Sequence, residues 1–251
     1  MRSFIAGLML VASAAVFADI VAGNGQVQTE NRPVAAFSRV AVGGSGILRV
    51  HRGPRKVEVT SDSNILGLIS TEVAGGELEI GFKPFTSVTS YTTLEYDVTM
   101  PDLSALRLSG SGDAYVDTFS GDDISMAVSG SGGVKADLAY SRVELETAGS
   151  GGFDAKVLAK SLALRCSGSG DAFIAGRADS ADLVVSGSGF VGARSFEVAD
   201  ARVIISGSGN IEIKAVSSLD ATVSGSGEVK YWGRPSLTQR VRGSGEIVAA
   251  H

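Results

Sequence analysis

The sequence predicts an all-β protein, a right-handed parallel β-helix (solenoid) with roughly 18–20 residues per coil. A glycine-rich tetrapeptide of the SGSG type recurs at a near-constant spacing, and apolar residues alternate with polar ones before each copy. A unit this short cannot bury its own apolar face, but stacked units form a continuous core. The tetrapeptides begin at Ser109, Ser129, Ala148, Ser167, Ser186, Ser206, Ser224 and Arg242, at intervals of 20, 19, 19, 19, 20, 18 and 18 residues.

Residues 1–18, MRSFIAGLMLVASAAVFA, have the organisation of a secretory signal peptide. Arg2 supplies a positive start, an apolar run begins at Phe4, and Val16 and Ala18 stand where signal peptidase reads. We expect cleavage before Asp19 and a mature protein that is periplasmic, surface-associated or secreted. The alternative, a retained membrane anchor, is disfavoured by the shortness of the run. No later apolar run is long enough to span a bilayer, so no transmembrane segment is predicted in the mature chain.

The composition excludes one class of partner and one source of stability. The 251 residues carry a net charge of −5 without a cluster of lysine or arginine, so no nucleic-acid partner is expected. Cys166 is the single cysteine, which excludes an internal disulfide. It occupies the apolar position that precedes each tetrapeptide, where other repeats have leucine, valine or isoleucine. We therefore predict a buried structural thiol rather than a nucleophile.

The part of the chain before the regular repeats is expected to be organised differently. Residues 19–32 form an N-terminal extension, and residues 33–100 form irregular first coils or a cap, because solenoids need atypical ends to protect exposed edges. Strands are readable in FSRVAV, GILRV, KVEVTSD, ELEIGF and LEYDVTM. Residues 44–46 are a partial copy of the tetrapeptide, and NILGLIS predicts a short helical turn after an asparagine cap at Asn64.

Residues 101–248 contain the regular coils. In the repeat that begins at Ser186 the apolar alternation shifts twice, which predicts two bends between three short strands per coil. The inward side chains of this repeat would be Val191, Ala193, Phe196, Val198, Ala201, Val203 and Ile205. Coils stack about 4.8 Å apart, as neighbouring strands do, and parallel crossovers are overwhelmingly right-handed.

The tetrapeptide itself is interpreted as architecture. A flexible linker would not hold a regular period, and a phosphate-binding loop needs a helix start after its glycines. If the alternation runs through the tetrapeptide, Gly130 and Gly132 face inward while Ser129 and Ser131 face solvent. Glycine on the inside would let the wall bend or lie close to the opposite wall, and glycine alone reaches positive φ at low cost.

Few residues in the sequence are arranged as metal ligands or catalytic groups. SGSGD at Asp113 and Asp171 resembles a calcium repeat, but a carboxylate does not recur at that position in every coil. Only Glu228 and Glu246 are acidic in adjacent repeats, where two solvated acids are favoured over one weak cation site. Acidic residues such as Asp122 and Asp123 suit a bend, and the histidines are His51 and His251 alone. No catalytic residue, metal site or cofactor is predicted.

Outward aromatic side chains are the candidates for a binding face. By the alternation of the strands, Tyr115, Phe173 and Phe190 point into solvent just after their tetrapeptides. Flat rings on a ridged β-surface stack on sugars or anchor a partner protein. The alternative is that these rings cover a loop or pack against one another. Tyr231 and Trp232, where YWGRPS interrupts the last repeat, are assigned to a cap.

The order of several pieces matches a known family. FSRVAVGGSGILRVHRG is followed by KVEVTSDSNILGLISTEVAGGELEIGF, then by YDVTMPDLSALRLSGSGDAYV and repeated VSGSG units. This arrangement, over residues 33–248, resembles the auto-transporter adhesin head domain, also called the GIN domain. The resemblance implies a right-handed β-helix in an exported bacterial protein for which adhesion has been proposed. It carries over no individual binding residue, because the shared motif is the structural glycine repeat.

These observations predict an exported, adhesin-like, non-enzymatic binding module. Its ridged face would meet a protein or glycan of the cell envelope or of a host surface. The alternatives are a structural cell-envelope protein without a specific ligand and a carbohydrate-active β-helix enzyme. Such an enzyme needs carboxylates that converge in a groove, and the acidic residues here are scattered.

Overall fold

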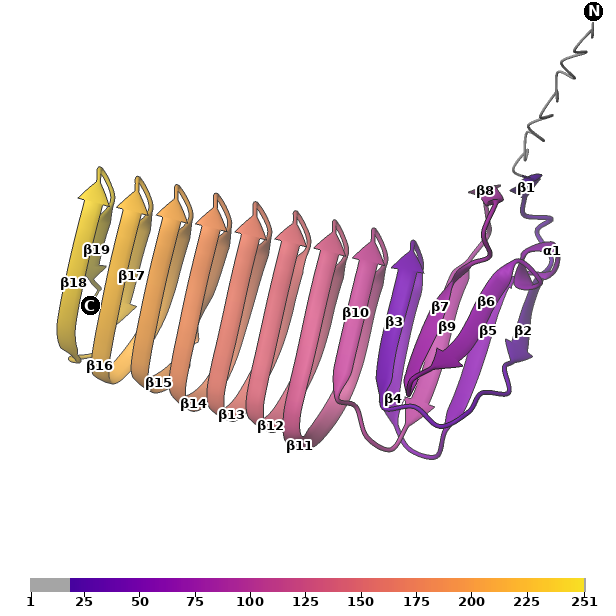
Figure 1. Ribbon diagram of the computed structural model, residues 1–251, viewed down its shortest axis with the longest axis horizontal. Coiled ribbons are helices and arrows are strands. Elements are labelled where there is room, and N and C mark those ends of the chain that lie inside the picture. The colour runs from indigo at the N-terminus through magenta and orange to yellow at the C-terminus, as the bar shows by residue number, and fades with distance from the viewer. Residues whose placement is uncertain (1–18, 251) are drawn as a thin grey trace, which may run out of the picture.

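The computed structural model describes residues 19–250, which form a rod of stacked β-strands (Figure 1). The predicted signal peptide, residues 1–18, and His251 lie outside the described residues. The first strands are β1 (Asp19–Ala22), β2 (Val27–Asn31), β3 (Arg39–Gly44), β4 (Ile47–Arg52), β5 (Lys56–Asp62), β6 (Ile69–Ala74), β7 (Glu77–Phe82), β8 (Thr86–Ser90) and β9 (Leu94–Met100), with helix α1 (Ser63–Leu66) between β5 and β6. The later strands are β10 (Ala105–Gly110), β11 (Asp113–Gly130), β12 (Gly133–Gly149), β13 (Gly152–Gly168), β14 (Asp171–Gly187), β15 (Phe190–Gly207), β16 (Asn210–Gly225), β17 (Glu228–Trp232), β18 (Ser236–Gly243) and β19 (Glu246–Ala249).

The predicted right-handed parallel β-solenoid is confirmed. Strands β10 to β16 pair in parallel with their sequence neighbours, and equivalent residues of successive tetrapeptides lie opposite one another, as Gly130, Gly149 and Gly168 do. Figure 1 shows each coil rising along one face, turning at the tetrapeptide and descending along the other face. The turn therefore separates two sheets. We call the sheet before each tetrapeptide the leading sheet and the sheet after it the trailing sheet.

Each coil is more continuous than the sequence predicts. Strands β11 to β16 each run through the bend opposite the tetrapeptide, so a coil is one bent strand rather than three short ones. The two predicted shifts of alternation are present in β15, where inward positions pass from Ala193 to Phe196 and from Val198 to Ala201. In β12 the alternation is unbroken from Val134 to Tyr140, and only the second shift remains. Two bends per coil is therefore wrong as a general rule.

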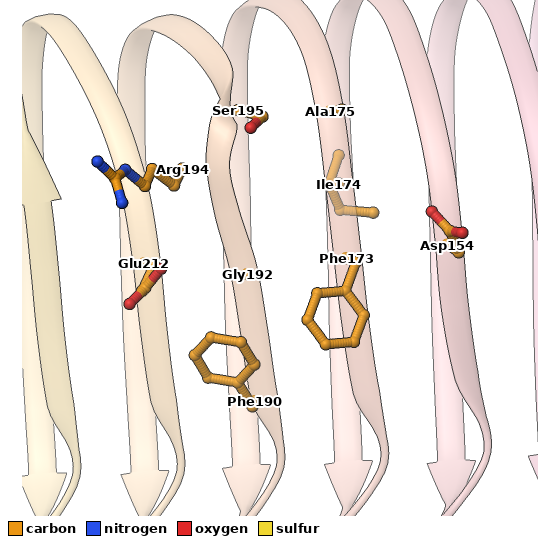
Figure 2. Close-up of a pocket in the computed structure, with 9 residues that line it drawn as sticks. All are labelled: Asp154, Phe173, Ile174, Ala175, Phe190, Gly192, Arg194, Ser195 and Glu212. Atoms are coloured by element: carbon orange, nitrogen blue, oxygen red, sulfur yellow. The ribbon is translucent and has the colours of Figure 1, made fainter.

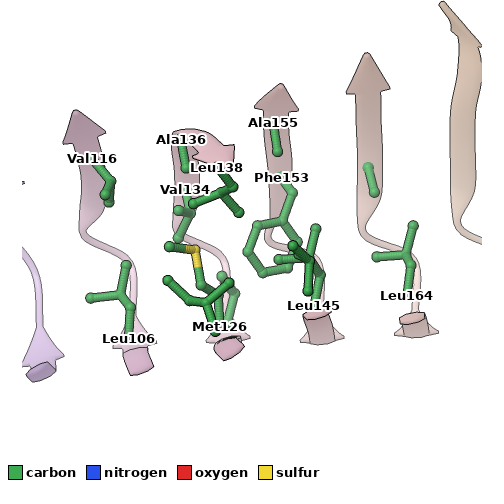
Figure 3. Close-up of a cluster of buried hydrophobic side chains, with 14 of the residues drawn as sticks. Leu106, Val116, Met126, Val134, Ala136, Leu138, Leu145, Phe153, Ala155 and Leu164 are labelled. Atoms are coloured by element: carbon green, nitrogen blue, oxygen red, sulfur yellow. The ribbon is translucent and has the colours of Figure 1, made fainter. Parts of the chain in front are cut away.

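The interior is filled by columns of apolar side chains that repeat from coil to coil (Figure 3). Leu106, Met126, Leu145 and Leu164 stack in register along the leading sheet. Cys166 is buried in the next column, as predicted, and burial raises the pKa of its thiol to about 12. Thr147 lies in the same column, where its hydroxyl donates to the carbonyl oxygen of Gly151 at 2.9 Å across the turn.

The tetrapeptide glycines match the prediction in the positive φ of the first glycine and the inward orientation of the second, but the predicted inward orientation of the first glycine is wrong. The first glycine of each copy is not inward: Gly168 is exposed and has a φ of 113°, in the left-handed region. A Cβ built there would lie 2.5 Å from the carbonyl oxygen of Gly149 in the preceding coil. The second glycine, Gly170, is buried and faces Gly151 equally closely. Both glycines are required because successive turns stack backbone on backbone, as the hydrogen bond from the amide of Ser169 to Gly149 (2.9 Å) shows.

The first coil precedes the regular repeats. Strands β3 and β4 pair in parallel with β10 and β11, which sets Gly44 opposite Gly110 and Ile47 opposite Asp113. Residues 44–46, predicted to be a partial copy, thus belong to a complete tetrapeptide turn, GGSG at residues 43–46. The chain then leaves the coil at residue 53 and returns at β10.

The excursion closes the N-terminal end of the rod. Strands β7 and β9 pair in parallel with β3 and β4, and β6, β5 and β2 continue outward in antiparallel pairs. Strands β1 and β8 form a separate two-stranded sheet. We call residues 53–104 with β1 and β2 the cap. The predicted helical turn is present as α1, but Asn64 lies inside it, and its side chain accepts a hydrogen bond from the amide of Asn24 at 3.1 Å.

A buried carboxylate fastens the arm that carries β1 to the cap. Asp62 is fully buried and accepts hydrogen bonds from the amides of Gly25 and Thr92, both at 2.6 Å, and from the hydroxyl of Thr92 at 2.9 Å. The bond from the Thr92 amide is the main reason why the pKa of Asp62 lies below its ordinary value, although burial acts in the opposite direction.

Candidate functional site

An outward column of the trailing sheet contains two of the three predicted aromatic residues. Its members share the position three residues after each tetrapeptide and lie in parallel register. In order along the rod they are Arg49, Tyr115, Lys135, Asp154, Phe173, Gly192, Glu212 and Lys230. We call this set the outer column. It mixes rings, both signs of charge and one glycine on a rigid sheet.

The structure brings Phe173 and Phe190 together and leaves Tyr115 apart. The centroids of the two phenyl rings are 5.8 Å apart with an interplanar angle of 61°, the edge-to-face arrangement that aromatic pairs favour. Tyr115 shares the outer column with Phe173 but lies three coils away, about 14 Å at the usual strand spacing. Phe173 is 52% exposed and Tyr115 47% exposed. The rings do pack on one another, as the alternative interpretation held, yet Phe173 stays half open to solvent.

A shallow depression lies beside the Phe173–Phe190 pair (Figure 2). Gly192, the neighbour of Phe173 in the next coil, forms part of its floor. The other lining residues are Asp154, Ile174, Ala175, Arg194, Ser195 and Glu212. The two rings, Arg194 and Glu212 therefore line the same small volume, and the guanidinium of Arg194 extends away from the rings (Figure 2).

Arg194 is held in place by the ring of Trp232, a residue that was predicted to belong to a cap. Its guanidinium carbon lies 4.9 Å from the centroid of the Trp232 ring, within the range of a cation–π contact. Trp232 and Tyr231 belong to β17 and pair with Lys214 and Ile213 of β16. Their assignment to a cap is wrong, because YWGRPS interrupts the repeat only after the trailing strand has been completed. A spacing count from the tetrapeptide would have placed Trp232 on this face.

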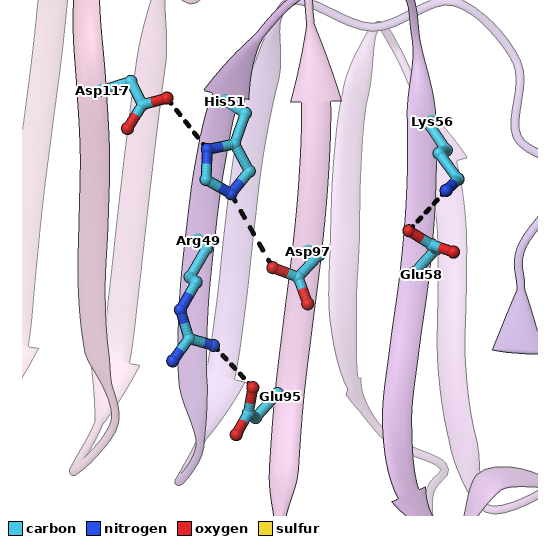
Figure 4. Close-up of polar contacts among 7 residues, drawn as sticks. All are labelled: Arg49, His51, Lys56, Glu58, Glu95, Asp97 and Asp117. Atoms are coloured by element: carbon cyan, nitrogen blue, oxygen red, sulfur yellow. Dashed lines mark hydrogen bonds and ion pairs between the residues drawn. The ribbon is translucent and has the colours of Figure 1, made fainter. Parts of the chain in front are cut away.

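A second group of polar side chains lies where the cap meets the first coils (Figure 4). Arg49 pairs with Glu95 at 2.6 Å, and Lys56 pairs with Glu58 at 2.7 Å. His51 places Nδ1 2.9 Å from Asp117 and Nε2 3.8 Å from Asp97. Both ring nitrogens thus face carboxylates, so His51 links β4 to β9 and β11 at the surface.

The aspartates after the tetrapeptides serve the stacking of the coils. The side chains of Asp113, Asp171 and Asn210 accept hydrogen bonds from the amides of Gly133, Phe190 and Glu228 in the following coil, at 2.9, 3.1 and 2.9 Å. Glu228 and Glu246 lie opposite each other in β17 and β19. Within residues 19–250 no three His, Cys, Asp or Glu side chains are arranged to hold a metal ion. Asp123 pairs with Arg142 of the next coil at 3.2 Å.

The fold and this face define a class: a capped, right-handed parallel β-solenoid whose side chains vary on the outside and repeat on the inside. A family model described as "Putative auto-transporter adhesin, head GIN domain" matches residues 36–235, and the chain belongs to this family. No functionally curated protein matches the chain in sequence.

Several solved structures of the same fold come from Parabacteroides species. A "putative lipid binding protein" from Parabacteroides distasonis is 28% identical, with a TM-score of 0.88 over 93% of this chain and 100% of that chain. A "putative adhesin" from the same species is 26% identical, with a TM-score of 0.87 over 92% and 100%. A "putative adhesin" from Parabacteroides merdae, 22% identical with a TM-score of 0.85 over 93% and 100%, shares the fold.

Helices contribute little to the described part of the chain. Across residues 19–250 the structure contains no helix with the length and apolar character needed to cross a membrane.

Proposed function

We propose that this protein is an exported, non-enzymatic binding module that presents the outer column of its trailing sheet to a protein or glycan of a cell envelope or host surface. The observation that carries the proposal is the exposed Phe173–Phe190 pair beside a depression with polar groups, on a sheet that the glycine turns hold rigid. Tyr115 extends the same face toward the cap. The family and the two adhesin structures support a partner outside the cytoplasm.

The arrangement of charges favours binding over catalysis. Glycoside hydrolysis needs two carboxyl groups that flank one bond, with no competing partners. In the outer column Asp154 pairs with Lys135 at 3.3 Å. Beside this column, Asp171 accepts a hydrogen bond from the amide of Phe190. The thiol of Cys166 is buried inside the rod, which removes a candidate nucleophile. Affinity would come from several modest contacts along the face.

The proposal is tested by binding of purified residues 19–251 to isolated bacterial envelopes and to glycan arrays. The expected result is saturable binding that falls by about thirtyfold in a Tyr115→Ala/Phe173→Ala double variant, since the loss of each ring removes roughly 1 kcal/mol of contact. Arg165→Ala, on the exposed side of the leading sheet, is the matched control and should bind as the wild type does.

Two other outcomes would change the proposal. Binding that survives the double variant but is lost in Arg165→Ala would move the face to the leading sheet and overturn the proposed site. Absence of binding to every envelope and glycan would favour a structural role in the envelope.

A further inference from the structure

We propose that the depression at Phe173, Phe190 and Gly192 binds the ring of a neutral sugar. This inference rests on the binding function proposed above and names the ligand chemistry of the same face. It depends on three features of the site: a glycine that keeps two rings together, a donor and an acceptor without protein partners, and a local balance of charge.

Glycine at position 192 is required by the packing of the two phenyl rings rather than by the backbone conformation. Its φ lies outside the left-handed region, so other residues would fit the local conformation. A Cβ built on it would lie 2.9 Å from Cε1 of Phe190 and 3.0 Å from Cδ1 of Phe173. Any side chain at this position would therefore push the two rings apart and fill the floor of the depression. The glycine keeps open the space beside the two rings, where the C–H face of a sugar ring can rest against an aromatic face.

The polar rim offers one hydrogen-bond donor group and one acceptor group. Neither Arg194 nor Glu212 forms an ion pair within residues 19–250, and both line the depression. Contact with Trp232 holds the guanidinium of Arg194 in place before a ligand arrives. Figure 2 shows these two side chains on the side of the depression away from Asp154. Sugar hydroxyls both donate and accept, so one ring satisfies both groups.

The charges around the depression favour a neutral ligand. Lys135 neutralises Asp154 at 3.3 Å. Glu197 forms an ion pair at 2.6 Å with Lys214, which lies in the next coil. Arg194 and Glu212 then balance one another. A phosphate or an acidic sugar would find no net positive charge there, because among residues 19–250 Arg194 is the one cation that lines the depression and Glu212 lines it as well, which opposes its binding. An apolar peptide side chain would take Arg194 and Glu212 out of water without replacing their hydrogen bonds.

The chain contains its own probe for the test. Trp232 is the only tryptophan, and it contacts Arg194 directly. Residues 19–251 are titrated with methyl glycosides of glucose, galactose, mannose and N-acetylglucosamine and with their short oligosaccharides. Tryptophan fluorescence and saturation-transfer NMR are recorded. We expect at least one neutral sugar to change the fluorescence saturably and to receive saturation through its ring C–H protons.

Three variants locate the site. Gly192→Val fills the floor without removing a ring and should weaken sugar binding by about tenfold or more. Phe173→Ala should act similarly. Arg165→Ala, on the exposed side of the leading sheet, is the matched control and should leave sugar binding unchanged. Thermal melting of each variant verifies that the rod is folded.

The outcomes separate this inference from the proposed function. Envelope binding without binding of any neutral sugar would overturn the sugar site and leave the binding module standing. If Gly192→Val abolished envelope binding while no sugar bound, the occupant would be a protein. Glucosamine and glucuronic acid are titrated as charged counterparts, and binding restricted to either of them would overturn the choice of a neutral ligand. Sugar binding unchanged in Gly192→Val would place the site elsewhere.

Discussion

The two ends of the rod differ in how their interiors are covered. At the N-terminal end β7 and β9 lie on the first coil, and their inward residues Leu78 and Tyr96 are fully buried. At the other end every residue of β18 is exposed, and its inward residues Leu237 and Val241 are 36% and 44% open to solvent. The interior of the rod is thus sealed at one end and open at the other.

This difference indicates how stability is distributed along the rod. In a solenoid each coil contacts only its neighbours, so its stability depends on whether both neighbours are present. The middle coils have two neighbours, the first coil has a cap, and the last coil has one. Arg240 and Arg242 line the open edge, which charged side chains protect from unwanted strand pairing. We expect opening to begin at β18 and β19 and to reach the cap last.

The largest effect should come from one substitution placed in a middle coil and again in the last coil. Gly168→Val forces a left-handed conformation on valine and drives its side chain into Gly149, with an expected loss of about 3–5 kcal/mol of unfolding free energy. Gly243→Val creates the same conflict with Gly225 but in a coil with one neighbour. It should cost about 1 kcal/mol or less, because the last coil frays without opening the rest. Chemical denaturation measures both, and equal losses would contradict the gradient.

The cap should be the region most sensitive to acid. The folded-state pKa of Asp62 lies below its ordinary value of 3.8, so the unfolded chain binds more protons as the pH falls. Its contribution to stability is fully present above the ordinary value and is lost as pH falls through the folded pKa. Asp62→Asn should therefore be less stable than the wild type at neutral pH and should lose less stability on acidification.

The control for this prediction is an exposed aspartate. Asp123→Asn removes a surface ion pair with Arg142, which should change stability very little. Melting temperatures from about pH 6 to about pH 2 check both variants. If the wild type and Asp62→Asn lost stability in parallel, the hydrogen bonds of Asp62 would not anchor the cap.

The contrast between the repeats and the ends also separates what the sequence predicts from what it does not. The coil positions and the buried state of Cys166 follow from a spacing that appears in every repeat. The orientation of Gly168 was mispredicted because alternation cannot pass through a residue with positive φ. The way in which the cap strands pair across long sequence distances leaves no periodic signal to read.

The candidate site was predictable in part for the same reason. Alternation places Phe173 and Phe190 outward, and their proximity follows from the register of neighbouring coils. Gly192, Arg194 and Trp232 were missed because their role depends on neighbours in other coils rather than on a motif. Reading residues down the columns of a repeat alignment, instead of along the chain, would have found Gly192 next to Phe173.

A smaller difference in stability is expected when two residues of one inward column are changed, one in a middle coil and one at the open end. Thr147→Val removes the hydrogen bond to Gly151 while keeping the shape, with an expected loss of about 1 kcal/mol. Val241→Thr, in the same column of the last coil, places a hydroxyl where solvent already reaches and should leave stability nearly unchanged. Denaturation curves compare them. A larger loss from Val241→Thr would mean that the last coil is packed as tightly as the middle.

The smallest effect on stability, and the sharpest contrast in reactivity, is expected from moving the single thiol. Cys166→Val should cost about 1 kcal/mol or less, since valine already occupies this column at Val185. In the native wild type, burial and a thiol pKa of about 12 should keep Cys166 unreactive toward a disulfide reagent until the middle coils open. Adding Val241→Cys to Cys166→Val puts the thiol on the open coil, where labelling should be immediate. Equal labelling rates at the two positions would show that the coils open together, and the difference between the two ends would then have no consequence for stability.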